Sequence, residues 1–72
     1  MEALKVEGQR FKGRRGTWYL IDTEVVGTER WYMYESEQYG DDAMHLIVDR
    51  NGKELCETYD PLEFAVKEAL DL

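Results

Sequence analysis

The sequence predicts an α+β domain: an antiparallel sheet of four to five strands, connected as a β-meander and followed by one C-terminal helix packed on one face. Short runs rich in β-branched and aromatic residues alternate with turn-forming residues over most of the chain. Residues 61–72 instead place apolar side chains at helical spacing. The chain of 72 residues contains no repeat, linker or low-complexity tract, so we expect a single domain over residues 1–72.

The strands are expected one after another along the chain, and a break at Gly8 divides the first of them. The expected strands are residues 4–6 continued by 10–12, then 17–26, 31–37, 44–49 and 55–58. Gly27 and Thr28 turn the chain after the second strand, and residues 40–42 form a loop before the fourth. A run of strands followed by one helix favours an antiparallel α+β arrangement.

The turn between the last two strands can be predicted in detail. A three-residue hairpin loop, a type I turn with Gly52 in the left-handed bulge position, sets Asp49 opposite Lys53. A two-residue turn at Asn51 and Gly52 would instead place Asp49 opposite Glu54, a like-charge pair. The sequence therefore favours the three-residue loop.

The C-terminal helix has the clearest signals of any element. Asp60 is predicted as its N-cap and Pro61 as its first residue, and Glu63 completes a capping box. Tyr59 and Phe64 occupy the hydrophobic-staple positions on either side of the cap. The residues expected to face the core follow one helix face: Leu62, Ala65, Val66, Ala69 and Leu70.

One helix cannot cover both faces of the predicted sheet. The helix would be about 18 Å long and about 10 Å wide, whereas four or five strands make a sheet about 20 Å wide. Large apolar groups nevertheless alternate onto both faces: Trp18 and Leu20 with Tyr19 and Ile21, and Trp31 and Met33 with Tyr32 and Tyr34. Either the sheet curls around its own core, or a patch rich in Trp and Tyr is left for a partner.

Charge is distributed unevenly along the chain, whose net charge is −7. Residues 1–15 hold five bases and two acids, whereas residues 16–72 hold four bases and 14 acids. An acidic field repels phosphate backbones and attracts basic surfaces, so a protein with a basic surface is the favoured partner. Alternatively, the charge only keeps a small domain soluble.

Few residues could support catalysis or metal binding. Cys56 is the only cysteine and His45 the only histidine, so neither an intramolecular disulfide nor a zinc site of the usual Cys/His kind is expected. Glu35 and Glu37 lie two apart on a predicted strand, which fits a solvated edge better than an acid–base pair. We expect Cys56 to be a small core residue. The sequence predicts no enzyme, no metal and no cofactor.

One basic segment suggests an alternative function, nucleic-acid binding. Basic residues with an interleaved aromatic can hold a single-stranded nucleic acid by charge and stacking. The residues that would do so here are Arg10, Lys12, Arg14, Arg15 and Trp18. The net acidity of the chain favours a solvated loop instead, so nucleic acid is the less favoured partner.

Nothing in the sequence indicates export or membrane insertion, because no apolar run has the length of a signal peptide or of a span. A lone cysteine fits a reducing, cytoplasmic setting. Because a core of this size leaves little surplus stability, a homodimer is a live alternative.

Three stretches, residues 16–22, 34–43 and 46–49, resemble small phage and mobile-element proteins. Those proteins are similar to a domain that also occurs within large polyvalent proteins of such elements, and Glu-Ser-Glu-Gln-Tyr-Gly-Asp-Asp at residues 35–42 is the most specific part of the likeness. The resemblance implies no catalytic residues. It implies a setting, the bacterial host cytoplasm during infection or element transfer.

In that setting, short acidic proteins often resemble inhibitors of host defence, such as anti-CRISPR and anti-restriction proteins, and we expect a similar inhibitory or regulatory role through nucleic-acid mimicry. The alternative is a structural or assembly module, or a homodimer, without inhibitory activity. The acids expected to meet a basic partner are Glu35, Glu37, Asp41, Asp42, Glu57, Glu63 and Glu68. The aromatic residues expected to serve as apolar anchors are Trp31, Tyr32, Tyr34 and Tyr39.

Overall fold

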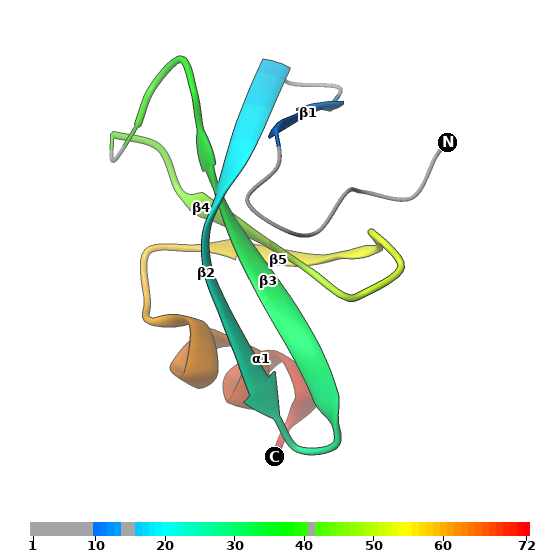
Figure 1. Cartoon of the computed structure of the whole chain (residues 1–72). Coiled ribbons are helices and arrows are strands. Elements are labelled where there is room, and N and C mark those ends of the chain that lie inside the picture. The colour runs from blue at the N-terminus through cyan, green and yellow to red at the C-terminus, as the bar shows by residue number, and fades with distance from the viewer. Residues whose placement is uncertain (1–9, 14–15, 41) are drawn as a thin grey trace.

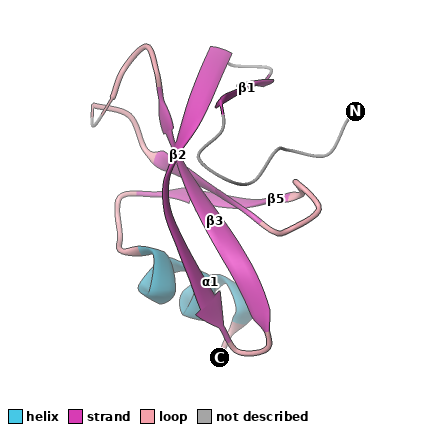
Figure 2. Ribbon diagram, in the orientation of Figure 1, coloured by secondary structure: helices cyan, strands magenta, loops and turns pink. Residues whose placement is uncertain are grey.

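The computed structural model describes residues 10–13, 16–40 and 42–72 of the chain. Its elements are β1 (Arg10–Gly13), β2 (Gly16–Val26), β3 (Glu29–Ser36), β4 (His45–Val48), β5 (Glu54–Thr58) and α1 (Leu62–Leu70). The strands form one antiparallel sheet in the order β1-β2-β3-β4-β5, and α1 follows the last strand (Figures 1 and 2). The predicted α+β meander is confirmed. The strand expected at residues 4–6 lies outside the described residues.

The turn between β4 and β5 has the predicted form. The backbone N–H of Asp49 donates to the carbonyl oxygen of Lys53 at 2.9 Å, so these residues are opposite each other. Gly52 has a φ of 86°, the left-handed conformation that glycine adopts without steric cost. The carboxylate of Asp49 also accepts hydrogen bonds from the N–H groups of Asn51 and Lys53. The loop is therefore stabilised by local hydrogen bonds of Asp49 and Lys53 and by the conformation of Gly52, the residues on which the prediction depended.

The start of α1 differs from the prediction. Pro61, and not Asp60, is the N-cap; its ψ of 150° is extended, and no side chain caps the helix. The backbone N–H of Asp60 donates to the hydroxyl of Thr58, which keeps the chain out of the helix at this point. The capping box is therefore wrong. The staple is wrong as well, because Tyr59 and Phe64 are both strongly exposed.

The end of α1 is a Schellman motif. Asp71 adopts a left-handed conformation with φ 60°, and its N–H donates to the carbonyl oxygen of Glu68. The N–H of Leu72 donates to the carbonyl oxygen of Lys67 at 2.9 Å, the second bond of the motif. The chain thus leaves the helix next to the β2–β3 turn, where Leu72 lies close to Gly27.

A β-bulge at Ile21 divides β2 into two parts. Leu20 pairs with Tyr34 and Asp22 pairs with Met33, so Ile21 is an extra residue between them. Because side chains alternate along a strand, this insertion reverses which face the following residues occupy. The N-terminal part of β2 consequently serves one face of the sheet, and its C-terminal part serves the other.

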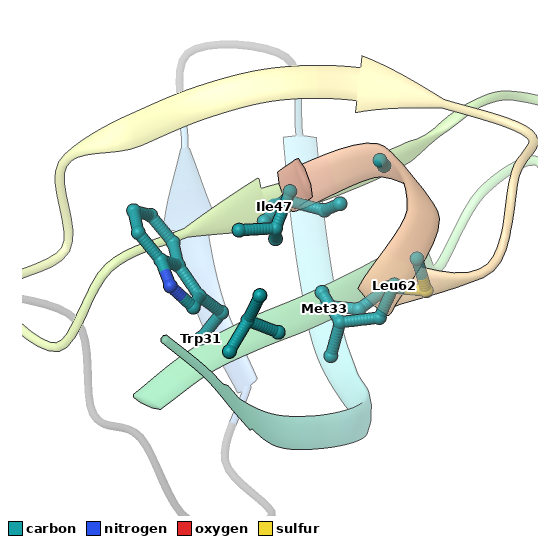
Figure 3. Close-up of a cluster of buried hydrophobic side chains, with 7 residues drawn as sticks. Trp31, Met33, Ile47 and Leu62 are labelled. Atoms are coloured by element: carbon teal, nitrogen blue, oxygen red, sulfur yellow. The ribbon is translucent and has the colours of Figure 1, made fainter. Parts of the chain in front are cut away.

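The first face packs against α1 and forms what we call the helix-side cluster (Figure 3). Its buried members are Val26, Trp31, Met33, Ile47, Leu62, Ala65 and Val66. Half-buried Leu55 and Cys56 pack against it from β5, where a second irregularity in the ladder leaves Leu55 without an opposite residue. The first half of the predicted helix stripe is therefore buried, whereas Leu70 remains exposed.

The opposite face forms the aromatic cluster, which consists of Trp18, Tyr32, Tyr34, Leu46 and Val48. All five side chains are buried although no helix of the described chain packs over them. The sheet turns strongly between β3 and β5, which runs across the long β2–β3 hairpin in Figure 1. The radius of gyration is 11.2 Å, and compact chains of this length have values of about 11 Å. Of the two outcomes expected from the sequence, the structure shows the curled sheet.

Candidate partner-binding surface

Most of the aromatic residues predicted as partner anchors lie in the interior. Trp31, Tyr32 and Tyr34 are at most 8% exposed. Their assignment as surface anchors is wrong, because the curled sheet and α1 together bury both faces of β3. Tyr39 is 56% exposed and is the one predicted aromatic anchor that lies at the surface.

The predicted acidic residues do not form one surface. Glu35 and Glu57 lie on opposite faces of the sheet, because Glu57 pairs with Leu46 of the aromatic cluster. Exposed Glu37 and Asp42 belong to the connection between β3 and β4. Glu63 and Glu68 are exposed on α1, and Asp41 lies outside the described residues.

Glu35 is engaged within the domain. Its Oε2 accepts a hydrogen bond of 2.5 Å from the hydroxyl of Tyr19, and its Oε1 lies 3.7 Å from Nε2 of His45. The three residues come from adjacent strands β2, β3 and β4 and form one partly buried polar row across the sheet. The side chain of Glu35 therefore joins three adjacent strands.

The most exposed large apolar side chains of the described chain lie on or beside α1. Phe64 and Leu72 are 70% and 71% exposed. Successive residues of a helix are about 100° apart, so Phe64 points away from the sheet when Leu62, Ala65 and Val66 point toward it. A shallow groove of about 620 Å³ follows this outer face, and it is lined by Asp60, Pro61, Phe64, Lys67, Glu68, Asp71 and Leu72.

Charge along this groove is mainly negative. Three of its lining residues are acids, and its single base, Lys67, already forms an ion pair of 2.9 Å with Glu63. The exposed carbonyl end of the helix, next to Asp71, adds partial negative charge. We refer to the groove and its acidic margin as the outer helix face. It combines exposed apolar side chains, Phe64 and Leu72, with an acidic margin.

The outer helix face was not identified from the sequence, although a signal for it was present. The predicted staple assigns Phe64 to a contact with Tyr59, and this prediction depends on Asp60 as the N-cap, one residue before the observed N-cap Pro61. Phe64 does not belong to the apolar stripe that begins with Leu62, so the same helical periodicity places it among solvent-facing positions.

A second, smaller pocket lies under the connection between β3 and β4. Its volume is about 180 Å³, and its lining residues are Trp18, Ser36, Tyr39, Ala43, Met44 and Glu57. The hydroxyl of buried Ser36 accepts a hydrogen bond of 3.2 Å from the N–H of Tyr39, and its carbonyl accepts one from Gly40. These bonds hold the start of the connection against the end of β3.

The predicted nucleic-acid contacts are only partly described by the structure. Arg10 and Lys12 belong to β1, an edge strand, while Arg14 and Arg15 lie outside the described residues. Trp18 is buried in the aromatic cluster. The expectation that Trp18 stacks on a base is therefore wrong.

The surroundings of Cys56 disfavour its ionised form. Burial raises the pKa of the Cys56 thiol, and the nearby Glu68 carboxylate raises it further, which makes the thiolate scarce. Within the described residues, no three His, Cys, Asp or Glu side chains lie close enough together to hold a metal ion. The helix found in that part of the chain has nine residues, and a membrane span needs about 20.

Comparison with known proteins identifies one family. Residues 3–69 match the family model described as Large polyvalent protein-associated domain 18. No curated protein and no solved structure matches the chain significantly. The match covers most of the sequence and includes all five strands and nearly the whole helix. The chain therefore belongs to the large polyvalent protein-associated domain 18 family.

Proposed function

We propose that this domain is a protein-binding module, without catalytic activity, whose outer helix face docks on a basic, partly apolar surface of another protein. The observation that carries the proposal is Phe64, an aromatic side chain that is 70% exposed and lines an acidic groove. Aromatic side chains, phenylalanine included, are enriched in the buried core of protein interfaces.

The energetics of this face suit binding. Burying a phenylalanine side chain contributes about 1.5–3 kcal/mol. The carboxylates at the margin attract Lys and Arg of a partner, which favours encounter and correct orientation. A second copy of the domain would present the same acids, so self-association through this face is opposed by charge. The alternative of a homodimer therefore finds no support at the outer helix face.

The partner that we propose is a nucleic-acid-handling or defence protein of a bacterial host cell. Such proteins carry the basic grooves that a domain with a net charge of −7 would enter. Docking there would compete with nucleic acid, so the domain would act as an inhibitor in the manner of a nucleic-acid mimic. Membership in a family associated with large polyvalent proteins fits the mobile-element setting of this proposal.

The test begins with capture from host lysate by the wild-type domain and by two variants. Phe64→Ala removes the centre of the groove, and Val25→Ala removes an exposed apolar residue on β2. We expect Phe64→Ala to reduce affinity for the captured protein about tenfold or more, and Val25→Ala to leave it unchanged. Circular dichroism confirms that both variants are folded. Equal capture by all three proteins would rule out the outer helix face.

The inhibitory part of the proposal needs a second measurement. The captured protein is purified, and its binding to DNA and RNA is measured by gel shift with and without the domain. Competition that weakens as salt rises supports the inhibitor. Binding of domain and nucleic acid at the same time would favour a structural or assembly role. A shift produced by the domain alone, and lost in Arg14→Glu with Arg15→Glu, would favour nucleic-acid binding through residues 10–15.

A further inference from the structure

We propose that Asn51 is a modification site, at which the folded β4–β5 loop, residues 49–53, slows a spontaneous loss of the side-chain amide. Asn51 is the only asparagine of the chain, its side chain is exposed, and Gly52 follows it. In an Asn-Gly pair the backbone nitrogen of the glycine can attack the side-chain carbonyl of the asparagine, because no Cβ hinders the approach. The loop joins β4 to β5 and takes no part in the outer helix face.

The reaction balances with water as its only co-reactant. A bond forms between the backbone nitrogen of Gly52 and Cγ of Asn51, and the bond from Cγ to the amide nitrogen breaks. Ammonia leaves with the proton of the Gly52 N–H, and a cyclic imide remains. Water then opens the imide: attack at Cγ restores the normal chain as an aspartate, and attack at the backbone carbonyl gives isoaspartate.

Asp49 holds both residues of the Asn-Gly pair. Its Oδ1 accepts hydrogen bonds from the backbone N–H groups of Asn51 at 2.8 Å and of Lys53 at 2.9 Å. Its carbonyl oxygen accepts a bond of 3.0 Å from the N–H of Gly52, the nitrogen that would attack. The attacking nitrogen therefore has a partner in the closed loop, and this bond must break before the nitrogen can react with Cγ of Asn51.

Charge in the loop acts in the same direction. The attacking nitrogen must lose its proton, so the reaction passes through an amide anion. The Asp49 carboxylate is bonded to the N–H groups of Asn51 and Lys53, on either side of this nitrogen, and a nearby negative charge disfavours the formation of an anion. The reaction therefore requires the loop to open, and its rate follows the population of the opened form.

The products would not fit the closed loop. Each of them adds a carboxylate close to that of Asp49, and like charges so near each other destabilise the pairing of strands. Isoaspartate also adds a backbone carbon, and the length of a hairpin loop selects its turn type. A chain that has lost the amide is therefore expected to close its loop less well, so the modification marks molecules whose loop has opened.

The test follows amide loss at position 51 in the full chain by peptide mapping with mass spectrometry at pH 8. The folded protein is compared with the same chain in denaturant. A blocked peptide of residues 48–54, without denaturant, shows whether denaturant itself alters the reaction. We expect the folded protein to lose the amide at least about tenfold more slowly than either reference.

Variants locate the protection. Asp49→Ala removes the side-chain acceptor and is expected to speed amide loss in the folded protein about tenfold. Arg50→Ala changes an exposed neighbour in the same loop and is expected to leave the rate nearly unchanged. Each rate is divided by the rate of the same variant in denaturant, which cancels direct effects of sequence. Val66→Ala, at a buried position of α1, destabilises the domain away from the loop and controls for global unfolding. Circular dichroism confirms that all variants are folded.

Three results would each overturn the proposal. Equal rates in the folded protein and in both references would show that the loop gives no protection. Retention of the amide in both references would show that Asn51 is not a modification site. Equal acceleration by Asp49→Ala and Arg50→Ala, or greater acceleration by Val66→Ala than by Asp49→Ala, would show that the bonds of Asp49 do not control the reaction.

Discussion

The two faces of the sheet reach the same degree of burial by different means. The helix-side cluster is mostly aliphatic and is closed by α1. The aromatic cluster is built around Trp18, Tyr32 and Tyr34 and is enclosed without any helix from the described chain. The bulge in β2 and the irregularity in β5 increase the twist of the sheet, which bends it around the larger side chains.

This difference shows where binding surfaces arise in so small a domain. A surplus of apolar strand residues suggested an exposed aromatic face, but curling of the sheet removes that face from solvent. Exposed apolar groups lie instead on the outer side of α1, with Phe64, in the β3–β4 connection, with Tyr39 and Met44, and on β2, with Ile21 and Val25. Phe64, Tyr39 and Met44 belong to neither cluster, so contacts made by these side chains do not require the core to open.

The largest expected effect on stability comes from truncating one buried side chain in each cluster. Leu46 and Ile47 are neighbours on β4, both almost fully buried, and they face the aromatic cluster and the helix-side cluster respectively. We expect Leu46→Ala and Ile47→Ala each to lower the free energy of unfolding by about 2–5 kcal/mol. Urea denaturation followed by fluorescence measures both.

The comparison between the two variants is the informative part. If Leu46→Ala cost less than about 1 kcal/mol while Ile47→Ala cost several, the aromatic cluster would be loosely packed. Its aromatic side chains would then again be candidates for contact with a partner. Comparable losses establish two cores of equal importance.

Raising the pH from 10 to 12 should lower the free energy of unfolding by about 2–3 kcal/mol through Tyr34 of the aromatic cluster. Burial raises the pKa of Tyr34 from 10.0 to about 12, and the adjacent Tyr32 adds to the shift. Below pH 10 the phenol is neutral in both states, so it gives no pH dependence. Between pH 10 and 12 only the unfolded chain ionises there, so stability falls as pH rises. Denaturation curves at pH 9 to 12 should show a shallower decline in Tyr34→Phe than in the wild type.

Burial also raises the pKa of Cys56, which packs against the helix-side cluster. Part of the loss of stability at alkaline pH is therefore due to ionisation of this thiol in the unfolded chain. The difference between Tyr34→Phe and the wild type isolates the phenol. Identical slopes for the two proteins would mean that Tyr34 titrates normally and that the aromatic cluster admits water.

A smaller gain of about 0.5–1 kcal/mol is expected at the end of α1. Asp71 holds a left-handed conformation, φ 60°, that glycine adopts without the same cost. Asp71→Gly should therefore raise the midpoint of thermal unfolding. Asp71→Ala removes the same carboxylate but keeps a Cβ, so the difference between the two variants measures the backbone contribution alone. A greater stability of the alanine variant would contradict the cap geometry.

The smallest effect concerns the reactivity of Cys56. The folded protein should react with a thiol reagent at pH 8 at least about tenfold more slowly than the chain in denaturant, because burial disfavours the thiolate. Glu68→Gln removes a charge that also raises the pKa and should give a modest increase in rate. Glu63→Gln, which loses a charge paired with Lys67, should not. Equal rates for the two variants would place Glu68 too far from β5 to act on the thiol.

Features fixed by local chemistry were predictable from the sequence. The antiparallel meander, the presence of a C-terminal helix and the loop from Asp49 to Lys53 depend on residues close together in the chain, and the structure confirms all three predictions. The predicted helix start is wrong because the backbone N–H of Asp60 donates a hydrogen bond to the hydroxyl of Thr58 in the preceding strand.

Features that depend on distant contacts were not predictable. The burial of Trp31, Tyr32 and Tyr34 follows from the twist of the whole sheet, which no single segment encodes. The row of Tyr19, Glu35 and His45 requires the register of three strands. The small pocket under the β3–β4 connection likewise joins Trp18 to residues some twenty positions away, and periodicity within a segment does not predict it.

The bulge at Ile21 makes one strand contribute to two cores. Upstream of it, Trp18 and Leu20 pack with the aromatic cluster, and downstream of it Val26 packs with the helix-side cluster. Loss or gain of one residue in β2 would send one set of side chains to the wrong side of the sheet. The length of this strand is therefore constrained more tightly than its composition. Alignments of relatives should accordingly tolerate substitutions across residues 17–26 but show almost no gaps there.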